Sequence, residues 1–386
     1  MRIFFLIFFL GFNSLFSKPL QVEIHAKSAI LINAETGVVL FEKEADLPCH
    51  PASITKIATA LYILEKVDLS QVAVVTSESL KKKPSKGSWE NLPAHWLEED
   101  GTTLGLCKGE ELTVEALLHG MMLSSGNDAA NVLAETACGS IPQFIRNLNH
   151  ALSQIGCSKT RFHNPHGLHH LDHVTTARDM ALITARALKI PKFREIVNKR
   201  SYRKPRTNKS REAELKQSNR LLQEGPFYYS KAIGVKTGFT SHAKNTLVAA
   251  AEHEGRTLIA VLLGCEKREE RYVDAIALFE NAFAEKPIHR VLVEPSVRYK
   301  KELEGSKSPL FALLQHELAA NFYPAEEPSL RAEIHWKVPP LPIKKGTQVG
   351  EVLLYNEKEV IQTVPLRAEK SVHRTFWFTL KQFFHL

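Results

Sequence analysis

Ser53 and Lys56 have the residue types and the spacing of a nucleophile and its base. They lie three positions apart in residues 50–65, an apolar run with helical spacing, so their side chains would share one helix face. The lysine amine can accept the proton of the serine hydroxyl if burial or a nearby cation lowers the pKa of the amine. The pattern alone is weak evidence. It occurs three more times in the chain, at Ser79/Lys82, Ser201/Lys204 and Ser241/Lys244.

Two further triplets supply other groups that such a reaction needs. Ser-Gly-Asn at 125–127 interrupts a helical segment and offers a hydroxyl to relay a proton and a carboxamide to hold a substrate amide. Lys-Thr-Gly at 236–238 ends a strand and offers a cation and a hydroxyl to a carboxylate, with a glycine where the substrate backbone approaches. Ser-x-Asn and Lys-Thr-Gly each occur once in the chain, so the three elements in this order indicate a serine acyl-transfer site.

In these elements the sequence resembles the low-molecular-mass penicillin-binding proteins, which are D-alanyl-D-alanine carboxypeptidases of the active-site-serine family. The resemblance covers roughly residues 27–370 and is carried by PASITKIATA, SSGNDAAN, FHNPHGLHHLDHVTTARDMALI and GVKTGFT. It implies removal of the terminal D-alanine from peptidoglycan stem pentapeptides through an acyl-enzyme, in cell-wall synthesis and cell shape. It also implies binding of β-lactam antibiotics and no metal or other cofactor.

The resemblance assigns catalytic roles to three residues and to two backbone groups. Ser53 is the acylated nucleophile, Lys56 is its base, and Ser125 carries the proton to the leaving group. The oxyanion hole consists of the backbone N–H groups of Ser53 and Phe239. Phe239 departs from the family pattern, because many relatives have histidine or tyrosine there, which puts a side-chain contribution at this position in doubt.

The same resemblance assigns the substrate contacts. Asn127 holds the peptide, and Lys236 and Thr237 meet the terminal carboxylate of the substrate, beside Gly238. Arg271 matches loosely an arginine that serves the same carboxylate. A D,D-endopeptidase acting on cross-links would use the same residues, and the expected C-terminal domain and anchor favour the carboxypeptidase.

Three other functions compete with this interpretation. A serine β-lactamase needs a base that activates water, and Glu195 with Asn198 resembles such a pair, but it lies in a helical stretch 70 residues after Ser125. A metallopeptidase is suggested by the five histidines and the aspartate of residues 163–173. Pro165 and Gly167 make that segment a loop without a helical ligand pair, so we interpret its histidines as structural. A non-enzymatic wall-binding protein would not need the complete set of site residues.

The elements that position the site predict an α+β fold, an antiparallel sheet flanked by helices. We expect strands at 29–33 and 38–42, joined by a turn at Gly37, followed by the helix that starts at Ser53. Helical spacing from 113 to 137 is broken at 125–127, and more helix is expected up to about residue 190. Residues 81–105 are expected to form a surface excursion. A strand, turn and strand over 246–264 and a helix over 273–284 complete this domain.

The chain is expected to contain four parts. These are a signal peptide at 1–17, the catalytic domain at 18–285, a small β-rich domain at 286–369 and an amphipathic helix at 370–386. The signal is predicted because one positive charge precedes a short apolar run and then a short polar, small-residue region. The β-rich domain is predicted because short alternating runs separated by Pro, Gly and Asn follow residue 286.

The C-terminal segment predicts peripheral binding to an anionic membrane. A helical projection places aromatic and apolar residues on one arc and basic residues beside it. The arc consists of Phe376, Trp377, Leu380, Phe383 and Phe384, and the basic residues are Lys370, Arg374 and Lys381. With the predicted signal peptide, this places the protein on the periplasmic face of the cytoplasmic membrane.

The charge and the cysteines agree with an exported protein. A net charge of +8 suits an anionic lipid or wall polymer. It does not indicate nucleic acid, because the densest basic stretch, residues 199–211, lacks the aromatic spacing of a base-stacking surface. The five cysteines show no Cys-x-x-Cys spacing, and because their number is odd at least one is unpaired within the monomer.

Overall fold

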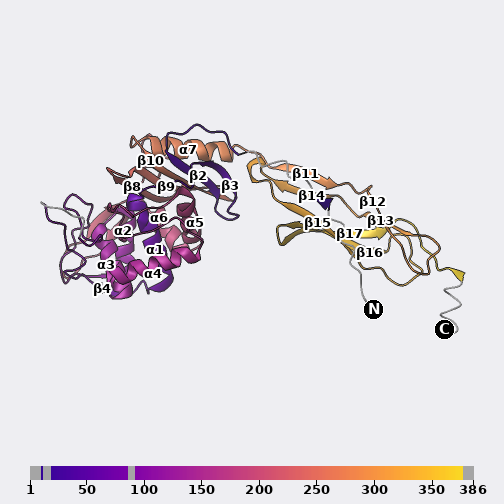
Figure 1. Cartoon of the computed structure of the whole chain (residues 1–386), viewed down its shortest axis with the longest axis horizontal. Helices are drawn as coiled ribbons and strands as arrows, with labels where there is room; N and C mark the ends of the chain where they lie inside the picture. Colours follow the sequence, from indigo (N-terminus) through magenta and orange to yellow (C-terminus); the bar gives the residue numbers. More distant parts are fainter. Residues whose placement is uncertain (1–9, 12–18, 86–91, 377–386) are drawn as a thin grey trace. The chain divides into compact units, whose positions relative to one another are not determined.

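The computed structural model describes residues 10–11, 19–85 and 92–376 (Figure 1). The chain forms two compact units, residues 19–284 and residues 285–386 together with 1–18. Each unit has an apolar cluster of its own. The buried members of the first cluster lie between Ile30 and Leu263, and those of the second lie between Val293 and Val372. The two units therefore have separate cores.

The first unit is built on a five-stranded antiparallel sheet with the strand order β3-β2-β10-β9-β8. Its strands are β2 (Ser28–Asn33), β3 (Val39–Lys43), β8 (Ala232–Thr240), β9 (Lys244–His253) and β10 (Arg256–Cys265). The early hairpin pairs with the late strands, since Ile30 of β2 lies opposite Val261 of β10. Strand β10 is buried almost throughout because helices cover both faces of the sheet.

Helix α7 (Glu270–Phe283) packs on β9 and β10, while α5 (Ala177–Leu188) and α6 (Pro191–Asn198) cover the opposite face (Figure 1). The other helices are α1 (Lys56–Lys66), α2 (Val114–Leu123), α3 (Asn127–Cys138) and α4 (Ile141–Gln154). Helix α1 contacts α2, α3, α4, α5 and α6, which buries its first turn. The predicted α+β arrangement, with a sheet flanked by helices, is confirmed.

Short elements connect these layers. Two-stranded ribbons join β4 (Val72–Val74) to β5 (Glu111–Thr113) and β6 (Ser201–Lys204) to β7 (Ala213–Lys216). Single 3-10 turns form η1 (Ala52–Thr55) and η2 (Arg220–Leu222).

The prediction of helix up to residue 190 is wrong for residues 155–176, which form a loop between α4 and α5. Gly156 and Gly167 have φ angles of +93° and +92°, which a right-handed helix does not allow. Isolated bridges join Cys49 to Thr175 and Arg161 to Val174, so the loop is fixed to the segment that precedes η1 instead of extending α4.

The second unit consists of β-strands, with one 3-10 turn, η3 (Pro324–Glu326), among its described residues. It contains a sheet of order β1-β15-β16-β17-β13-β12 and the separate pair β11-β14. The strands are β1 (Leu10–Gly11), β11 (Ile288–Val293), β12 (Arg298–Lys301), β13 (Leu310–Leu314), β14 (Leu318–Phe322), β15 (Leu330–Trp336), β16 (Gln348–Asn356) and β17 (Glu359–Ala368). In β16 and β17 inward apolar residues alternate with outward ones, as expected for a sheet with one solvated face.

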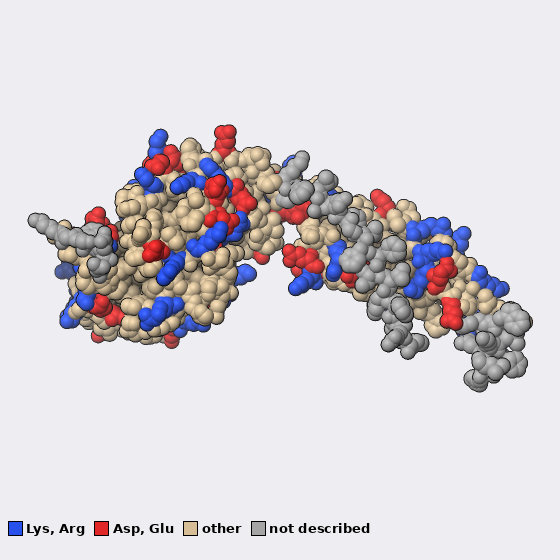
Figure 2. All heavy atoms as spheres, viewed as in Figure 1, with Lys and Arg blue, Asp and Glu red and all other residues tan. Residues whose placement is uncertain are grey.

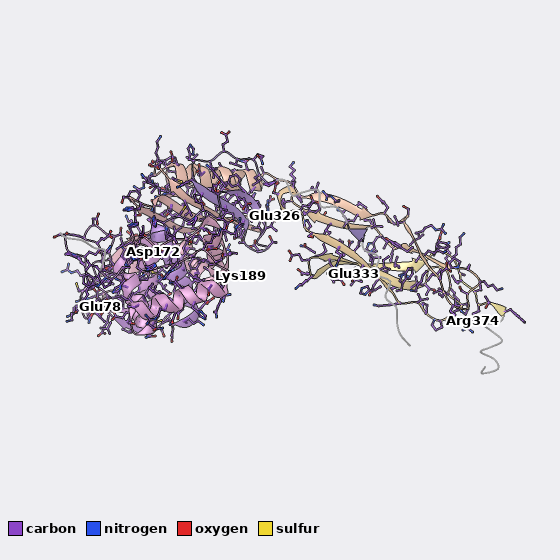
Figure 3. All side chains as sticks on the ribbon, viewed as in Figure 1. Glu78, Asp172, Lys189, Glu326, Glu333 and Arg374 are labelled. Atoms are coloured by element: carbon purple, nitrogen blue, oxygen red, sulfur yellow. The ribbon has the colours of Figure 1, made fainter. Side chains whose placement is uncertain are left out.

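The predicted helix over 370–386 is not formed in its first six residues. Val372 bridges Ile343 and Arg374 bridges Ser306, and the Val372 side chain is 2% exposed within the apolar cluster of the second unit. That burial, which a helix starting at Lys370 would lose, explains the extended backbone. Figure 3 labels Arg374 near the end of the described chain. Residues 377–386 lie outside the described part.

The predicted signal peptide also lies mostly outside the described part. Its residues Leu10 and Gly11 pair with Ala332 and Arg331 of β15. Among the described residues, no helix is long and apolar enough to cross a bilayer. All five cysteines are described, and all five are free.

Candidate active site

Ser53 lies in the 3-10 turn η1, directly before α1, with its side chain half-buried. Its hydroxyl caps neither η1 nor α1, since neither has a side-chain cap hydrogen bond. Instead, the Oγ of Ser53 is hydrogen-bonded to the Nζ of Lys56 at 3.0 Å. The predicted pair therefore meets in space, and the Ser53 hydroxyl caps no helix.

Lys56 is the first residue of α1 and is fully buried. Its Nζ lies 2.7 Å from the Oδ1 of Asn127 and 2.7 Å from the carbonyl oxygen of His166, in addition to Ser53. Burial holds the pKa of Lys56 well below its usual value, and the nearby charge of Lys236 lowers it further, against an opposing effect of Asp128. These causes favour the neutral amine that a general base requires.

Two glycines let three segments meet at Ser53. Gly167 has a φ of +92°, and a Cβ there would lie 1.9 Å from the carbonyl oxygen of Ala52. A Cβ at Gly238 would lie 2.9 Å from the backbone nitrogen of Ser53 and 2.4 Å from the Oγ1 of Thr246. The histidine-rich loop and strand β8 therefore both approach the nucleophile more closely than any side chain would allow.

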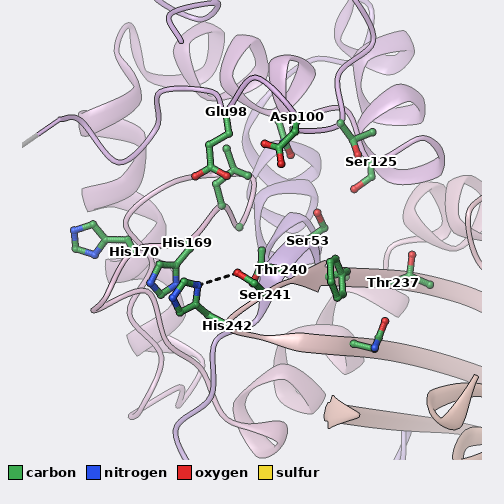
Figure 4. Close-up of a pocket in the computed structure, with 18 of the residues that line it drawn as sticks. Ser53, Glu98, Asp100, Ser125, His169, His170, Thr237, Thr240, Ser241 and His242 are labelled. Carbon is green, nitrogen blue, oxygen red and sulfur yellow. Dashed lines mark hydrogen bonds between the residues drawn. The ribbon is translucent and has the colours of Figure 1, made fainter. Parts of the chain in front are cut away.

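The predicted break at 125–127 separates α2 from α3. Ser125 has a φ of +63°. Asn127 is the first residue of α3, and its backbone N–H donates to the carbonyl oxygen of Thr102. Asn127 is buried and reaches Lys56, as described above. In the view of Figure 4, Ser125 lies above Ser53 of η1 and Thr237 of β8.

Lys236, Thr237 and Gly238 lie in β8, next to the Ser53 turn. The Nζ of Lys236 donates to the carbonyl oxygen of Thr237 at 2.9 Å, and the Oγ1 of Thr237 lies 3.0 Å from the Oγ of Ser218. Burial, with a contribution from Arg271, lowers the pKa of Lys236 to about 7. A substrate carboxylate would favour the protonated form of this amine.

Phe239 lies near the C-terminal end of β8, and Arg271 of α7 reaches the same end of this strand. The Nη1 of Arg271 donates to the carbonyl oxygens of Gly238 and Thr246, at 2.9 and 3.0 Å. Arg271 therefore holds β8 against β9, and its role toward a substrate carboxylate stays a prediction. The Phe239 side chain is 64% exposed.

A cavity of about 1360 Å³ brings the predicted site together. Its walls include seven of the nine predicted site residues: Ser53, Ser125, Asn127, Thr237, Gly238, Phe239 and Arg271. Lys56 and Lys236 lie behind this wall, fully buried. The arrangement presents a hydroxyl backed by a neutral amine, next to a cation, which suits attack on the carbonyl group of a substrate that carries a free carboxylate.

The comparisons with known proteins agree with this geometry. A sequence profile of D-alanyl-D-alanine carboxypeptidases matches residues 15–267. Over 363 residues the chain is 30% identical to D-alanyl-D-alanine carboxypeptidase DacF of Bacillus subtilis, covering 93% of this chain and 89% of that protein. The chain belongs to the D-alanyl-D-alanine carboxypeptidase family. It is a serine-type peptidase, and the predicted family resemblance is confirmed.

Two solved structures share this fold. A D-alanyl-D-alanine carboxypeptidase from Mycobacterium tuberculosis matches with a TM-score of 0.60 and 28% identity, over 70% of this chain and 95% of that one. Penicillin binding protein 6B from Escherichia coli matches with a TM-score of 0.64 over 92% of this chain and 98% of that one. At 23% identity, the second likeness shows the fold alone.

The carboxypeptidase site also uses residues that the sequence did not reveal. The excursion after Ser79 contributes seven residues to the cavity lining, among them Glu98 and Asp100 (Figure 4). The others are Lys83, Leu92, Ala94, Gly101 and Thr102. Asp128 anchors the end of this excursion, because its carboxylate accepts the backbone N–H groups of Leu104 and Leu106. Polar composition alone predicted a surface loop, and only its packing on α3 shows that it forms a wall of the site.

The glutamate that suggested a β-lactamase lies away from the cavity walls. Glu195 of α6 is paired with Lys192 at 2.6 Å and with Lys199 at 2.8 Å. These hydrogen bonds lower the pKa of Glu195 to about 2, which makes it a weak base. The structure therefore gives Glu195 no access to an acyl group on Ser53.

Two of the loop histidines are structural, as the sequence predicts. The Nε2 of His166 lies 3.1 Å from the carbonyl oxygen of His95, and its Nδ1 accepts the N–H of Leu168. The Nε2 of His173 lies 2.9 Å from the Oγ1 of Thr55. Burial lowers the pKa of both imidazoles well below the usual value, so both are neutral. They fix the loop against η1 and α1.

Proposed function

We propose that this chain is a D-alanyl-D-alanine carboxypeptidase that removes the terminal D-alanine from peptidoglycan stem pentapeptides through an acyl-enzyme on Ser53. Penicillins acylate the same hydroxyl. The family assignment supports this proposal, and the contacts of Lys56 carry it.

A neutral lysine amine has two hydrogens and one lone pair. Two of the three neighbours of Lys56 Nζ, the Oδ1 of Asn127 and the carbonyl oxygen of His166, can only accept hydrogen bonds. Two hydrogens directed at these oxygens leave the lone pair for the third neighbour, the hydroxyl of Ser53 at 3.0 Å. The pocket thus orients the amine to take the serine proton.

Acylation then proceeds with each proton accounted for. Lys56 takes the proton of Ser53 Oγ as that oxygen attacks the carbonyl carbon of the penultimate D-alanine. The negative oxygen of the tetrahedral intermediate faces the backbone N–H groups of Ser53 and Phe239. When the C–N bond breaks, Ser125 gives its proton to the leaving amine and is reprotonated from Lys56. Water then attacks the ester carbonyl while Lys56 takes a proton from it, and Lys56 returns this proton to Ser53 Oγ as the bond between that oxygen and the acyl carbon breaks.

Lys236 and Thr237 provide the specificity for a free carboxylate. Because the pKa of Lys236 is about 7, a bound carboxylate has a large effect on the charge of this amine near neutral pH. A substrate amidated at its C-terminus would leave the buried ammonium without a counter-charge. We therefore expect amidation to reduce cleavage strongly.

Mass analysis of two substrates tests the proposed bond. The full chain is incubated with a stem pentapeptide and with a D,D-cross-linked dimer, and the products are followed over time by mass spectrometry. Release of D-alanine from the pentapeptide at the higher rate is expected. Faster cleavage of the dimer would make the enzyme a D,D-endopeptidase, and rapid turnover of a penicillin, as opposed to lasting acylation, would make it a β-lactamase.

We also propose that the second unit is a small β-rich domain that carries an amphipathic membrane-binding segment at its C-terminus, on the periplasmic face of the cytoplasmic membrane. The predicted signal peptide and the aromatic arc support this location, and Phe376, the arc residue that is described, is 72% exposed. Figure 2 shows Lys and Arg side chains gathered over part of this unit. Each basic residue near an anionic surface adds about 1 kcal/mol at most.

Sedimentation with anionic vesicles tests the location. Deleting residues 377–386 keeps the buried Val372 in place and should release the protein from vesicles while its rate on a small soluble peptide stays unchanged. The control is the full chain with Lys358→Ala, a change at an exposed turn between β16 and β17, which should sediment like the wild type. A truncated chain that still sediments would contradict the proposal.

A further inference from the structure

Phe239 exposes an apolar side chain inside the active-site cavity. This side chain is 64% exposed, more than that of any other Phe, Tyr or Trp described in the first unit. It lines the same cavity as Ser53 and Thr237 (Figure 4). By contrast, Val235 of the same strand is buried in the apolar cluster. Exposed apolar surface in the wall of an active-site cavity indicates contact with a ligand.

The pairing of β8 with β9 shows which face of the sheet carries this side chain. Over residues 235–240 the two strands pair without a register shift, so successive side chains alternate between the faces. Thr237 and Phe239 therefore share one face, and Asn245 of β9 lies opposite Phe239 on that face. All three line the cavity, so this face is open to the substrate.

The other face of β8 carries the nucleophile. A Cβ at Gly238 would point to this face, where it would lie 2.9 Å from the backbone nitrogen of Ser53 and 3.1 Å from the Cβ of Ala52. The Ser53 turn therefore packs against β8 on the Gly238 face. A substrate at the edge of β8 meets Ser53 on one face and Phe239 on the other.

Strand β8 has a free edge on which an extended substrate can pair. It is the last strand in the order β3-β2-β10-β9-β8, so only one of its edges is hydrogen-bonded to another described strand of this sheet. In the proposed reaction, the backbone N–H of Phe239 donates to the carbonyl oxygen of the penultimate D-alanine, and the terminal carboxylate lies at Thr237. These contacts align the substrate antiparallel to β8, with the penultimate residue opposite Phe239 and the terminal residue opposite Gly238.

The configuration of the terminal residue decides where its side chain points. Directly opposite residues of an antiparallel pair direct L side chains to the same face. An L-residue opposite Gly238 would therefore point to the face of the Ser53 turn. A D-residue has the reverse handedness at its α-carbon, so its side chain points to the face of Thr237 and Phe239. The side chain of a leaving D-residue is thus directed toward the phenyl ring.

We propose that the Phe239 ring forms the subsite for the side chain of the leaving residue, and that the enzyme releases terminal D-residues with larger apolar side chains as well as D-alanine. This inference rests on the proposed carboxypeptidase reaction and widens its substrate class. Apolar contact is favourable in proportion to the area removed from water. The isobutyl group of D-leucine covers more of the exposed ring than the methyl group of D-alanine does.

Paired peptide substrates test the subsite. Stem pentapeptides ending in D-alanine or in D-leucine are incubated with the full chain, and kcat/KM for release of the terminal residue is measured by mass spectrometry. The wild type should cleave the two peptides with kcat/KM values within about tenfold of each other. Phe239→Ala should lower the ratio of the D-leucine value to the D-alanine value about fivefold or more. The ratio cancels any change in the oxyanion hole, which affects both peptides alike.

Two controls separate loss of the ring from other effects. Phe239→Tyr keeps the ring, so its ratio should stay within about twofold of the wild-type ratio. Val74 is 54% exposed on β4 and lies outside the cavity walls, so Val74→Ala should leave the ratio unchanged. Labelling by a fluorescent penicillin reports whether each variant is folded.

The outcomes distinguish this inference from the proposed function. A wild-type chain that labels with penicillin but releases no D-alanine refutes the proposed reaction itself. If D-alanine is released, cleavage of the D-leucine peptide more than about tenfold more slowly overturns the inference. A ratio in Phe239→Ala that equals the wild-type ratio overturns it too. A higher ratio in that variant would show that the ring excludes large leaving residues instead of binding them.

Discussion

The two units of this chain differ in whether they bury polar side chains. All buried polar or charged residues among the described positions lie between Ser28 and Asp274, within the first unit. In the second unit the buried side chains are apolar, and lysines such as Lys300 and Lys337 are more than half exposed and paired with glutamates. The first unit contains Lys56 and Lys236 with no exposed surface at all.

Burial of an ionisable group costs free energy, so buried lysines indicate a functional site in the first unit. A surface ion pair contributes about 0–1 kcal/mol and leaves a lysine charged. A buried lysine has a lowered pKa and can act as a base or respond to a bound carboxylate. The second unit has the burial pattern of an ordinary β-sheet core, in which the buried side chains are apolar. The first unit departs from this pattern, because it buries two lysine amines near Ser53.

The largest effect is expected at Ser53. Ser53→Ala should abolish covalent labelling by a fluorescent penicillin, because Ser53 carries the one hydroxyl that is hydrogen-bonded to Lys56 among the described residues. Stability should change by less than about 1 kcal/mol, since Ser53 caps no helix. Ser201→Ala is the control, because Ser201 belongs to another Ser-x-x-Lys pattern but is exposed on β6. Labelling of Ser53→Ala at full stoichiometry would refute the assignment.

Lys56→Arg should have the next largest effect. A guanidinium stays protonated and cannot accept the serine proton, so the acylation rate should fall at least about 100-fold. Stopped-flow measurement with a chromogenic penicillin gives this rate. Lys66→Arg, at the exposed end of the same helix, should acylate like the wild type. If Lys56→Arg acylates at the wild-type rate, another group is the base.

A core substitution in the second unit should affect stability alone. Leu354 of β16 is fully buried, and Leu354→Ala should destabilise this unit by about 2–5 kcal/mol. The penicillin acylation rate should not change, because the apolar clusters of the two units share no residue. Urea unfolding followed together with labelling checks both expectations. Ile361→Ala, at an exposed position of β17, should have little effect on either. Loss of labelling in Leu354→Ala would show that the units are coupled.

Local sequence patterns were sufficient to predict the elements that carry the site. Gly37 and the alternating runs around it gave the first hairpin, and the Ser-Gly-Asn triplet gave the junction of α2 and α3. These signals are local, since turn residues and hydrophobic periods act over a few positions. The three motifs then predicted which residues meet, and the structure brings them to one cavity.

Features that depend on tertiary contacts could not be predicted in the same way. The group of His166 that accepts the hydrogen bond of Lys56 is its backbone carbonyl. Every residue has this group, so the residue type could not predict the contact. The excursion contributes Glu98 and Asp100 to the cavity lining, and its backbone is held by hydrogen bonds to the side chains of Asp128 and Asn131, which lie far away in the sequence. Likewise, the spacing of the aromatic residues predicted a helix over 370–386, but burial of Val372 within the apolar cluster of the second unit holds the start of this segment extended.

The smallest effect is expected in the pH dependence of stability. Lys236 has a pKa of about 7 in the folded protein, against an ordinary value of 10.5. Above pH 7 the unfolded chain therefore binds more protons at this residue than the folded chain does. The free energy of unfolding should rise with pH between about 7 and 10, by at most about 1.4 kcal/mol per unit from this group.

Lys236→Met should remove this contribution, so the stability of the first unit should rise less steeply from pH 7 to pH 9 than in the wild type. The pKa of Lys56 is also lowered, and its main cause, burial, is the same in both proteins. The charge of Lys236 contributes to that shift, so the difference in slope reports Lys236 together with its effect on Lys56. Urea unfolding at three pH values measures it. Lys216→Met is the control, because the Lys216 side chain is 75% exposed, and its slope should match the wild type. Equal slopes in all three proteins would mean that Lys236 keeps its proton in the folded state and that burial does not set its charge.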